Sequence, residues 1–453
     1  MFKRILIANR GEIAVRIQRA CRRLGIETVV VHSTADKESL AVKLADVSIC
    51  IGPGPAKQSY LNINNIIAAA ELADVDAIHP GYGFLSENSH FAQVVRDCQI
   101  QFIGPLSAAM DALGNKAKAK NAAQKAGVPT VPGSTGPVAT SDEALAVARK
   151  IGFPVLIKAT AGGGGRGMRI AHNDASLVSG LIQAQREAEA AFGSSECIIE
   201  AYVQRARHIE IQIIGDQHGN VVALGERDCS TQRRHQKLVE ESPSPVIDAA
   251  TRAQMSDDAV KLAKAVGYYN AGTVEFIYDL DRKAYYFLEV NTRVQVEHPV
   301  TEMVTGIDII QTQIRVAAGE KLGFKQSDII TKGHAIEVRI NAEDWEKGFA
   351  PCPGKIGMYA APTGEGVRVD SHCYGGYTIP PHYDSMIAKL IVHGKDRTEA
   401  IRFLGQALDE YVIEGPRTTI GFHQRLIRDM RFVNSEVTTK FIDEEFLKHA
   451  AVH

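Results

Sequence analysis

Short apolar runs alternate with amphipathic stretches through the N-terminal part of the chain. The first amphipathic stretch has Ile13, Ile17, Ala20 and Leu24 at helical spacing, and Gly25 suits the C-terminus of such a helix. This alternation predicts an open parallel sheet with helices on both faces. The expected strands are RILIA (4–8), TVVVH (28–32), DVSICIG (46–52), DAIHPG (76–81) and IQFIGP (100–105), and the expected helices are 11–25, 62–73 and 90–98. The turn after the first strand reads ANRGEI rather than GxGxxG, so a dinucleotide site is not predicted.

The pattern changes in the middle of the chain. Residues 115–150 look helical, apart from a Pro/Gly/Thr-rich link at 127–141. Beyond them, turn sequences such as GDQHGN and DLDRK join segments that alternate apolar and polar residues, which is typical of antiparallel hairpins. These segments are PVLIKA (154–159), ECIIEAYV (196–203), RHIEIQIIGD (207–216), NVVALGERD (220–228), GTVEFIYD (272–279) and AYYFLEVN (284–291).

A third region begins near residue 333 with two more strand-like segments, 334–344 and 385–394. A helix follows them, with Asp396 and Glu399 suited to its N-terminus. Its apolar stripe consists of Ile401, Leu404, Leu408 and Tyr411. The chain therefore reads as mixed α/β and α+β in three regions.

Composition excludes several classes of protein. A chain of 453 residues is long enough for two to three domains, and its 45% hydrophobic and 23% charged residues are ordinary for a globular protein. A net charge of −2 gives no electrostatic reason to bind nucleic acid or an anionic membrane. The N-terminal apolar run is too short for a signal peptide, and no stretch has the length of a membrane span. The seven cysteines form no CxxC pair, which favours a reducing, cytoplasmic location.

The segment KATAGGGGRGM (158–168) places four consecutive glycines directly after a predicted strand. Successive backbone N–H groups in such a loop can bind an anion, and Lys158 adds a charge suited to phosphate. The lysine precedes the glycines, so the loop is not a Walker A loop. A phosphate-covering loop is the favoured interpretation, and a hairpin tip without a ligand is the alternative.

A row of polar residues is predicted on one face of FLEVNTRVQVEH (287–298), which reads as a strand with period two. The row consists of Glu289, Asn291, Arg293, Gln295 and Glu297, and the preceding strand of the hairpin adds Glu275. Two carboxylates and an amide make a hard-oxygen cluster that suits Mg²⁺. A half-exposed strand facing water is the alternative.

Two further signals are ambiguous by themselves. The stretch RDCSTQRRHQK (227–237) could form an anion site or a solvated charged face, and His208 could be structural or functional. A glycine loop, a carboxylate cluster and basic residues together suggest ATP-dependent chemistry.

With this combination of features, the chain resembles the ATP-grasp superfamily and, within it, the biotin carboxylase family. The resemblance extends over nearly the whole chain through ANRGEIA, HPGYGFLSEN, KATAGGGGRGM, RHIEIQ, FLEVNTRVQVEHPVTE, EVRINAED and YDSMIAKL. It implies an ATP-grasp fold with an N-terminal domain at 1–114, an ATP-grasp domain at 115–332 with a lid at about 131–203, and a C-terminal domain at 333–453. No Ala/Val-Met-Lys-Met biotin-acceptor motif is present, so the chain looks like the stand-alone biotin carboxylase subunit of a multisubunit acetyl-CoA carboxylase.

The resemblance also implies roles for individual residues. ATP is expected to contact Lys116, Lys158, Gly164, Gly165, Glu200, Ala201, Tyr202, Val203, His208, Gln232, His235, Glu275 and Glu289. Mg²⁺ or Mn²⁺ is expected at Glu275, Glu289 and Asn291. Bicarbonate and biotin are expected at Lys237, Arg293, Gln295, Val296 and Arg339. The catalytic set is Lys237, Arg293, Glu297, which takes the bicarbonate proton, and Arg339, which faces the biotin ureido oxygen.

By the same resemblance, bicarbonate and ATP give carboxyphosphate, and biotin is presented on a biotin carboxyl carrier protein. The other expected partners are carboxyltransferase subunits and a second copy of the chain. One departure from many relatives is Ala201, which replaces a lysine in the adenine hinge and could offer only backbone contacts there.

Three alternatives stay open at this level. One is another ATP-grasp ligase that joins a carboxylate to an amine, and Arg293, Gln295, Glu297 and Arg339 speak against it. The second is a biotin carboxylase subunit of a different acyl-CoA carboxylase. The third is a non-catalytic nucleotide-binding subunit.

Overall fold

The computed structural model describes residues 1–159, 168–192 and 194–450. The chain forms two compact units. The larger unit contains residues 1–128, 207–277 and 288–453, and the smaller one contains residues 129–206 and 278–287. The domain boundaries expected from the sequence stay predictions.

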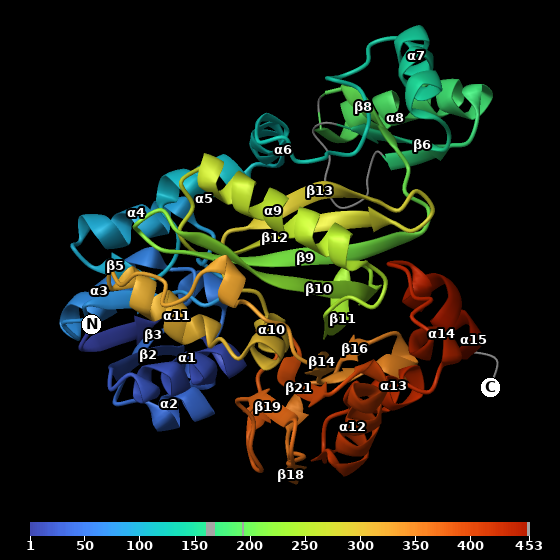
Figure 1. Cartoon of the computed structure of the whole chain (residues 1–453). Coiled ribbons are helices and arrows are strands. Elements are labelled where there is room, and N and C mark those ends of the chain that lie inside the picture. Colours follow the sequence, from blue (N-terminus) through green and yellow to red (C-terminus); the bar gives the residue numbers. More distant parts are fainter. Residues whose placement is uncertain (160–167, 193, 451–453) are drawn as a thin grey trace. The chain divides into compact units, whose positions relative to one another are not determined.

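The N-terminal part of the larger unit is a parallel sheet with strand order β3-β2-β1-β4-β5 (Figure 1). Its strands are β1 (Arg4–Ile7), β2 (Glu27–Ser33), β3 (Val47–Gly52), β4 (Ala77–His79) and β5 (Gln101–Phe102). The neighbouring helices are α1 (Gly11–Arg23), α2 (Leu40–Leu44), α3 (Ile63–Leu72), α4 (Ser89–Asp97), α5 (Ser107–Gly114) and α6 (Lys116–Lys125). Ile5 and Ile7 pack with α1, whereas Leu6 packs on the other face with α3 and α4, so the predicted two-sided parallel sheet is confirmed.

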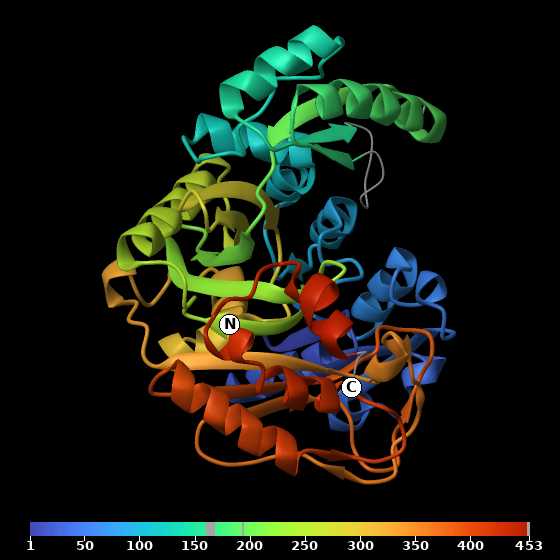
Figure 2. The same cartoon turned by 90° about the vertical axis from the view of Figure 1, so that its right-hand side faces the viewer.

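A second, eight-stranded sheet has the order β13-β12-β9-β10-β11-β14-β21-β19. The strands are β9 (Ala206–Gly215), β10 (Val221–Arg233), β11 (Gln236–Ser242), β12 (Asn270–Asp279), β13 (Ala284–Asn291), β14 (His334–Asn341), β19 (Val367–Ser371) and β21 (Met386–Gly394). The strands run antiparallel to their neighbours from β9 through β10, β11, β14 and β21 to β19, as the alternating pattern predicts. Helix α9 (Ala249–Ala265) lies along β10 (Figure 2). Because β11 pairs with β14, one sheet joins the second and third sequence regions.

Helix α12 (Arg397–Glu410) packs on β14 and β21 and closes the C-terminal core (Figure 1). The Asp396 side chain accepts a hydrogen bond from the Glu399 backbone N–H, which caps the helix as predicted. Leu404 and Leu408 of the predicted apolar stripe are buried in the core cluster. The other α-helices described in the larger unit are α10 (His298–Thr305), α11 (Ile309–Ala317), α13 (Ile420–Leu426), α14 (Met430–Val433) and α15 (Leu447–Ala450).

Short two-stranded ladders complete the larger unit. They are formed by β15 (Glu343–Asp344) with β16 (Ala350–Pro351), β17 (Gly354–Lys355) with β20 (Thr378–Ile379), and β18 (Tyr359–Ala360) with β22 (Val412–Ile413).

The smaller unit has a three-stranded antiparallel sheet with the order β7-β6-β8. It contains β6 (Val155–Ala159), β7 (Met168–Ala171) and β8 (Cys197–Ala201), covered by α7 (Ser141–Ile151) and α8 (Asp174–Phe192). Thr140 and Glu143 form a capping box at the start of α7. The glycines at 162–165 between β6 and β7 lie outside the described residues.

One predicted element is wrong in its length. The period-two pattern predicts a strand over 287–298, but β13 ends at Asn291 and α10 begins at His298. Pro299 stands at the start of α10, where its fixed φ favours a helix, so the extended conformation stops earlier than the alternation suggests. Arg293, Gln295 and Glu297 therefore lie in the connection between a strand and a helix.

Candidate active site

A cleft of about 1540 Å³ in the larger unit is lined by segments that follow β1 and β4 of the N-terminal sheet and by residues of the eight-stranded sheet. It brings together most of the site residues predicted from the sequence: Lys116, His208, Gln232, His235, Lys237, Glu275, Glu289, Asn291, Arg293, Gln295, Val296 and Arg339. Glu297 is fully buried and contacts two of these lining residues, Lys237 and Arg339.

Lys237 contacts three carboxylates of the site. Its Nζ atom lies 2.6 Å from a carboxylate oxygen of Glu210, 2.7 Å from Glu297 and 3.0 Å from Glu275. Burial alone would lower the pKa of this amine, but the three carboxylates raise it well above its ordinary value. Lys237 is therefore a permanent cation surrounded by acids.

Glu297 is held between two cations. Lys237 bonds one of its oxygens, and Arg339 Nη2 lies 3.1 Å from the other. Burial would raise the pKa of this carboxyl, yet Lys237, Arg339 and Arg227 hold it well below its usual range. The group is ionised at neutral pH and can accept a proton once a bound anion competes for its cations.

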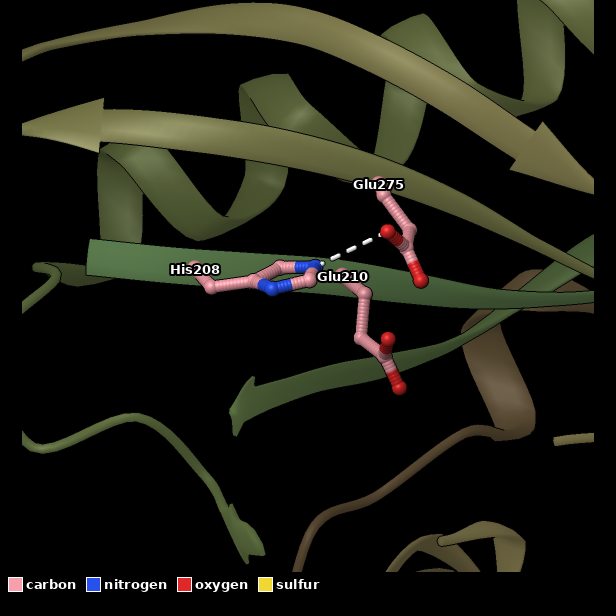
Figure 3. A group of neighbouring side chains, drawn as sticks. All are labelled: His208, Glu210 and Glu275. Atoms are coloured by element: carbon pink, nitrogen blue, oxygen red, sulfur yellow. Dashed lines mark hydrogen bonds and ion pairs between the residues drawn. The ribbon is translucent and has the colours of Figure 1, made fainter. Parts of the chain in front are cut away.

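His208, Glu210 and Glu275 form a compact polar cluster. Figure 3 shows His208 and Glu210 projecting from β9, where residues two apart share a face, and Glu275 projecting from β12 beside it. His208 Nε2 lies 3.0 Å from Glu275 Oε2, and one ligand atom from each residue lies within 4.8 Å of the others. Although burial opposes the charged form, Glu275 raises the pKa of His208. The cluster fixes the Glu275 carboxylate in place.

Only two of the three residues predicted to bind a metal ion, Glu275 and Asn291, are hydrogen-bonded to each other. Asn291 Nδ2 donates to Glu275 at 2.9 Å, whereas Glu289 pairs with Lys116 at 3.3 Å. Glu289 and Asn291 stand two residues apart on β13, so they share a face of the strand. Two carboxylates and an amide oxygen are a donor set that suits Mg²⁺ or Mn²⁺.

Arg293 is oriented by an acid from a distant segment. Its Nε atom lies 2.9 Å from Glu87, while Nη1 and Nη2 donate to Gln295 at 3.0 Å and Asn291 at 3.2 Å. Glu87 was missed in the sequence analysis, although it belongs to the quoted motif HPGYGFLSEN.

Arg339 lies at another side of the cleft, on β14. Its Nε and Nη2 atoms lie 2.6 and 2.5 Å from one oxygen of Glu240, so the guanidinium is fixed by Glu240 and Glu297 together. Sequence reasoning did not find Glu240, because nothing in LVEES marks one of its two adjacent acids.

A buried lysine supports the segment before Glu297. Lys389 on β21 is fully buried; its Nζ donates to the Val296 carbonyl at 2.7 Å and lies 3.2 Å from Glu12. The Tyr82 hydroxyl also donates to Glu12. Lys389 was missed too, although a lone lysine inside the apolar run MIAKLIV is a usable signal.

The other predicted ATP contacts belong to the smaller unit. Lys158 Nζ lies 3.6 Å from Glu200 across β6 and β8. Ala201 is buried and its N–H donates to the Pro132 carbonyl, while the N–H of Tyr202 donates to Pro154; Val203 follows them and is also buried. Gly164 and Gly165 lie outside the described residues. The contribution of this group to ATP binding stays a prediction.

Within the described ranges, no helix combines the length and the apolar character needed to cross a membrane. All seven cysteines are free.

Comparison with known proteins places the chain in a family. Three family models match: "Biotin carboxylase, N-terminal domain" at residues 1–110, "Carbamoyl-phosphate synthase L chain, ATP binding domain" at 115–325, and "Biotin carboxylase C-terminal domain" at 337–444. Biotin carboxylase 1 of Bacillus subtilis is 56% identical over 443 residues, which cover 98% of each chain.

Two solved structures are also similar. One is a biotin carboxylase–β,γ-ATP complex from Campylobacter jejuni, with 51% identity, 98% coverage of both chains and a TM-score of 0.89. The other is the biotin carboxylase domain dimer of the 2-oxoglutarate carboxylase from Hydrogenobacter thermophilus, in complex with MgADP, ADP and bicarbonate, with 48% identity, 98% coverage of both chains and a TM-score of 0.88. The chain thus belongs to the biotin carboxylase family and is an ATP-dependent carboxylase of the ligase class with an ATP-grasp fold.

Proposed function

We propose that the chain carboxylates biotin on a biotin carboxyl carrier protein, using ATP and bicarbonate, as the first half-reaction of an acetyl-CoA carboxylase in fatty acid synthesis. The observation that supports this most is the buried Glu297 carboxylate held between Lys237 and Arg339 beside the cleft. One carboxylate thereby connects a cation suited to bicarbonate with a cation suited to biotin.

Bicarbonate is a weak nucleophile, and its charge repels the phosphates of ATP. Lys237 and Arg293 would bind it and align one of its oxygens with the γ-phosphorus, so that positioning and charge neutralisation carry the step. Bound bicarbonate shares Lys237 with Glu297, and this raises the pKa of Glu297 toward that of a useful base. As Glu297 takes the bicarbonate proton, the new P–O bond forms, ADP leaves and carboxyphosphate results.

Carboxyphosphate would then break into CO₂ and phosphate, and the phosphate would remove the N1′ proton of biotin. Arg339 would stabilise the negative charge that develops on the ureido oxygen, while N1′ attacks CO₂. Because Glu240 and Glu297 already hold the guanidinium, Arg339 needs no reorganisation at that moment.

The remaining assignments are part of the same proposal. Glu275, Glu289 and Asn291 would hold Mg²⁺ or Mn²⁺, which neutralises charge on the ATP phosphates when bound. Lys116, His208, Gln232 and His235 would contact the nucleotide, together with the predicted residues of the smaller unit. A homodimer is proposed because the solved relative from Hydrogenobacter thermophilus is a dimer. The seven free cysteines support the cytoplasm as the location.

ATP hydrolysis, measured with and without bicarbonate and free biotin, tests the proposal. Hydrolysis is expected to require bicarbonate and to rise with biotin. In Arg339→Ala the biotin-dependent rate should fall by about 10²–10³-fold, while the KM for ATP stays near that of the wild type. Arg315→Ala is the control, because Arg315 lies in a half-exposed surface pair with Glu320. A large rise in the KM for ATP in Arg339→Ala would contradict the role given to Arg339.

The acyl-CoA or 2-oxo acid that finally receives the carboxyl group needs a separate experiment. A solved relative that belongs to a 2-oxoglutarate carboxylase shows that this fold serves more than one carboxylase. Co-purification with the native carboxyltransferase, followed by carboxylation assays with acetyl-CoA, pyruvate and 2-oxoglutarate, would separate them. Carboxylation of acetyl-CoA alone is the expected result.

A further inference from the structure

Glu337 is a buried acid two residues before Arg339 on β14. Ala335, Glu337 and Arg339 alternate with Ile336 and Val338, which belong to the C-terminal core on the other face. At the Ala335 end of this face, Val300 and Val304 of α10 cover the strand. Glu337 therefore lies between an apolar patch and the arginine of the cleft, with no exposed surface.

Among the described residues, three carboxyl oxygens at this position have no donor. Glu337 stands directly opposite Glu240 in the register of β14 and β11, so the two side chains share a face about 5 Å apart at Cβ. Arg339 bonds one oxygen of Glu240. Within the described part of the chain, the other oxygen of Glu240 and both oxygens of Glu337 are buried without a hydrogen-bond partner.

The charged and titratable groups near Glu337 come from several elements. They are Glu240 on β11, Glu297 before α10, Arg339 on β14, Lys389 on β21 and the Tyr82 hydroxyl. Both cations are already engaged: Arg339 bonds Glu240 and Glu297, and Lys389 bonds the Val296 carbonyl and pairs with Glu12 on α1. His298 on α10 adds no charge, because burial and nearby cations keep its pKa well below the ordinary value.

Burial therefore dominates the titration of this pair of acids. It raises the pKa of Glu337 well above the ordinary value, with Lys389 opposing and Glu240 adding to the shift. It also raises the pKa of Glu240, to about 7, against the effect of Arg339. Two opposed carboxylates in such surroundings repel each other unless one of them holds a proton.

We propose that Glu337 is a positioning residue, which holds a proton at neutral pH and donates it to the free oxygen of Glu240, so that Glu240 remains an anion on the guanidinium of Arg339. The proton turns one of the three buried oxygens into a donor and gives a second, the free oxygen of Glu240, a hydrogen-bond partner. Deprotonation of Glu337 at higher pH would set two carboxylates against each other and loosen the hold on Arg339. The link to biotin rests on the proposed function, whereas the protonation of Glu337 does not.

The test uses Glu337→Gln, which is neutral and can still donate, and Glu337→Leu, which cannot. The infrared difference spectrum of wild type minus Glu337→Gln at neutral pH should contain the carbonyl stretch of a protonated carboxylic acid. The KM for free biotin should stay within about threefold in the glutamine variant and rise about tenfold or more in the leucine variant, with the KM for ATP unchanged in both.

A pH profile of the biotin-dependent rate adds a readout that a merely structural role would not move. The wild-type rate should fall as pH rises through the pKa of Glu337, and Glu337→Gln should lack this decline because its amide does not titrate. Absence of the infrared band overturns the proposal, whether or not the protein carboxylates biotin. If Glu337→Leu folds, an unchanged KM for biotin in that variant overturns the positioning role. If Glu337→Leu does not fold, a pH profile of Glu337→Gln that equals the wild-type profile overturns the positioning role instead.

Discussion

Glu297 is the carboxylate that is proposed to accept the proton of bicarbonate. Replacement by glutamine keeps the shape of the side chain but removes its charge and its ability to accept the bicarbonate proton. We expect Glu297→Gln to reduce bicarbonate-dependent ATP hydrolysis by about 10²–10⁴-fold, which initial rates at saturating substrates would measure. Glu444→Gln is the control, since Glu444 lines the same cleft without a contact to Lys237 or Arg339 in the described structure, and an equal loss in both variants would refute the assignment.

Glu289 separates metal binding from the rest of the site. In Glu289→Gln one of the two proposed carboxylate ligands becomes a neutral amide, so the Mg²⁺ concentration that gives half-maximal ATP hydrolysis should rise about tenfold or more. Titration of Mg²⁺ at fixed ATP measures this value. The exposed Glu71 provides the control variant Glu71→Gln, and an unchanged Mg²⁺ requirement in Glu289→Gln would remove Glu289 from the metal site.

At the scale of single residues, the sequence pointed to the groups proposed to carry the chemistry more readily than to the groups that hold them in place. Lys237, Arg293 and Arg339 could be named because the chain resembles the biotin carboxylase family at their motifs. Glu240 and Glu87 were not named, because an acid becomes a partner of an arginine only when segments far apart in sequence meet.

Among the elements, β11 is tied to the C-terminal part by a buried ion cluster. Glu241 lies 2.8 Å from His334 on β14 and 2.7 Å from Arg397 at the start of α12. Burial would raise the pKa of Glu241, but Arg397 and His334 lower it from its ordinary 4.5 to about 2. This acid therefore stabilises the fold fully above pH 4.5, and the contribution is lost as pH falls from 4.5 through about 2.

Glu241→Gln should accordingly lose about 3 kcal/mol of unfolding free energy at pH 7. Its stability should also change less between pH 5 and 2 than that of the wild type. Urea unfolding at several pH values measures both effects. Glu27→Gln is a suitable comparison, because its pair with Arg4 is exposed and contributes at most about 1 kcal/mol. Equal losses in the two variants would contradict this account.

The spacing of apolar residues predicted most strands and helices, because an element buried on one face has apolar residues at the period of that element. It failed after Asn291, where polar and apolar residues keep alternating although the chain turns into α10. Arg293 and Gln295 at those positions line the cleft, so their polarity reflects their place in the cleft rather than an extended backbone.

At the scale of the whole molecule, the proposed reaction uses ATP and bicarbonate to carboxylate biotin. Its most direct test supplies bicarbonate labelled with radioactive carbon in one experiment and with a heavy oxygen isotope in another, with ATP, Mg²⁺ and free biotin. Labelled carboxybiotin is expected in the first experiment, and phosphate that retains an oxygen atom of bicarbonate is expected in the second. Phosphate that takes its new oxygen only from water, with no label in biotin, would contradict the proposed reaction.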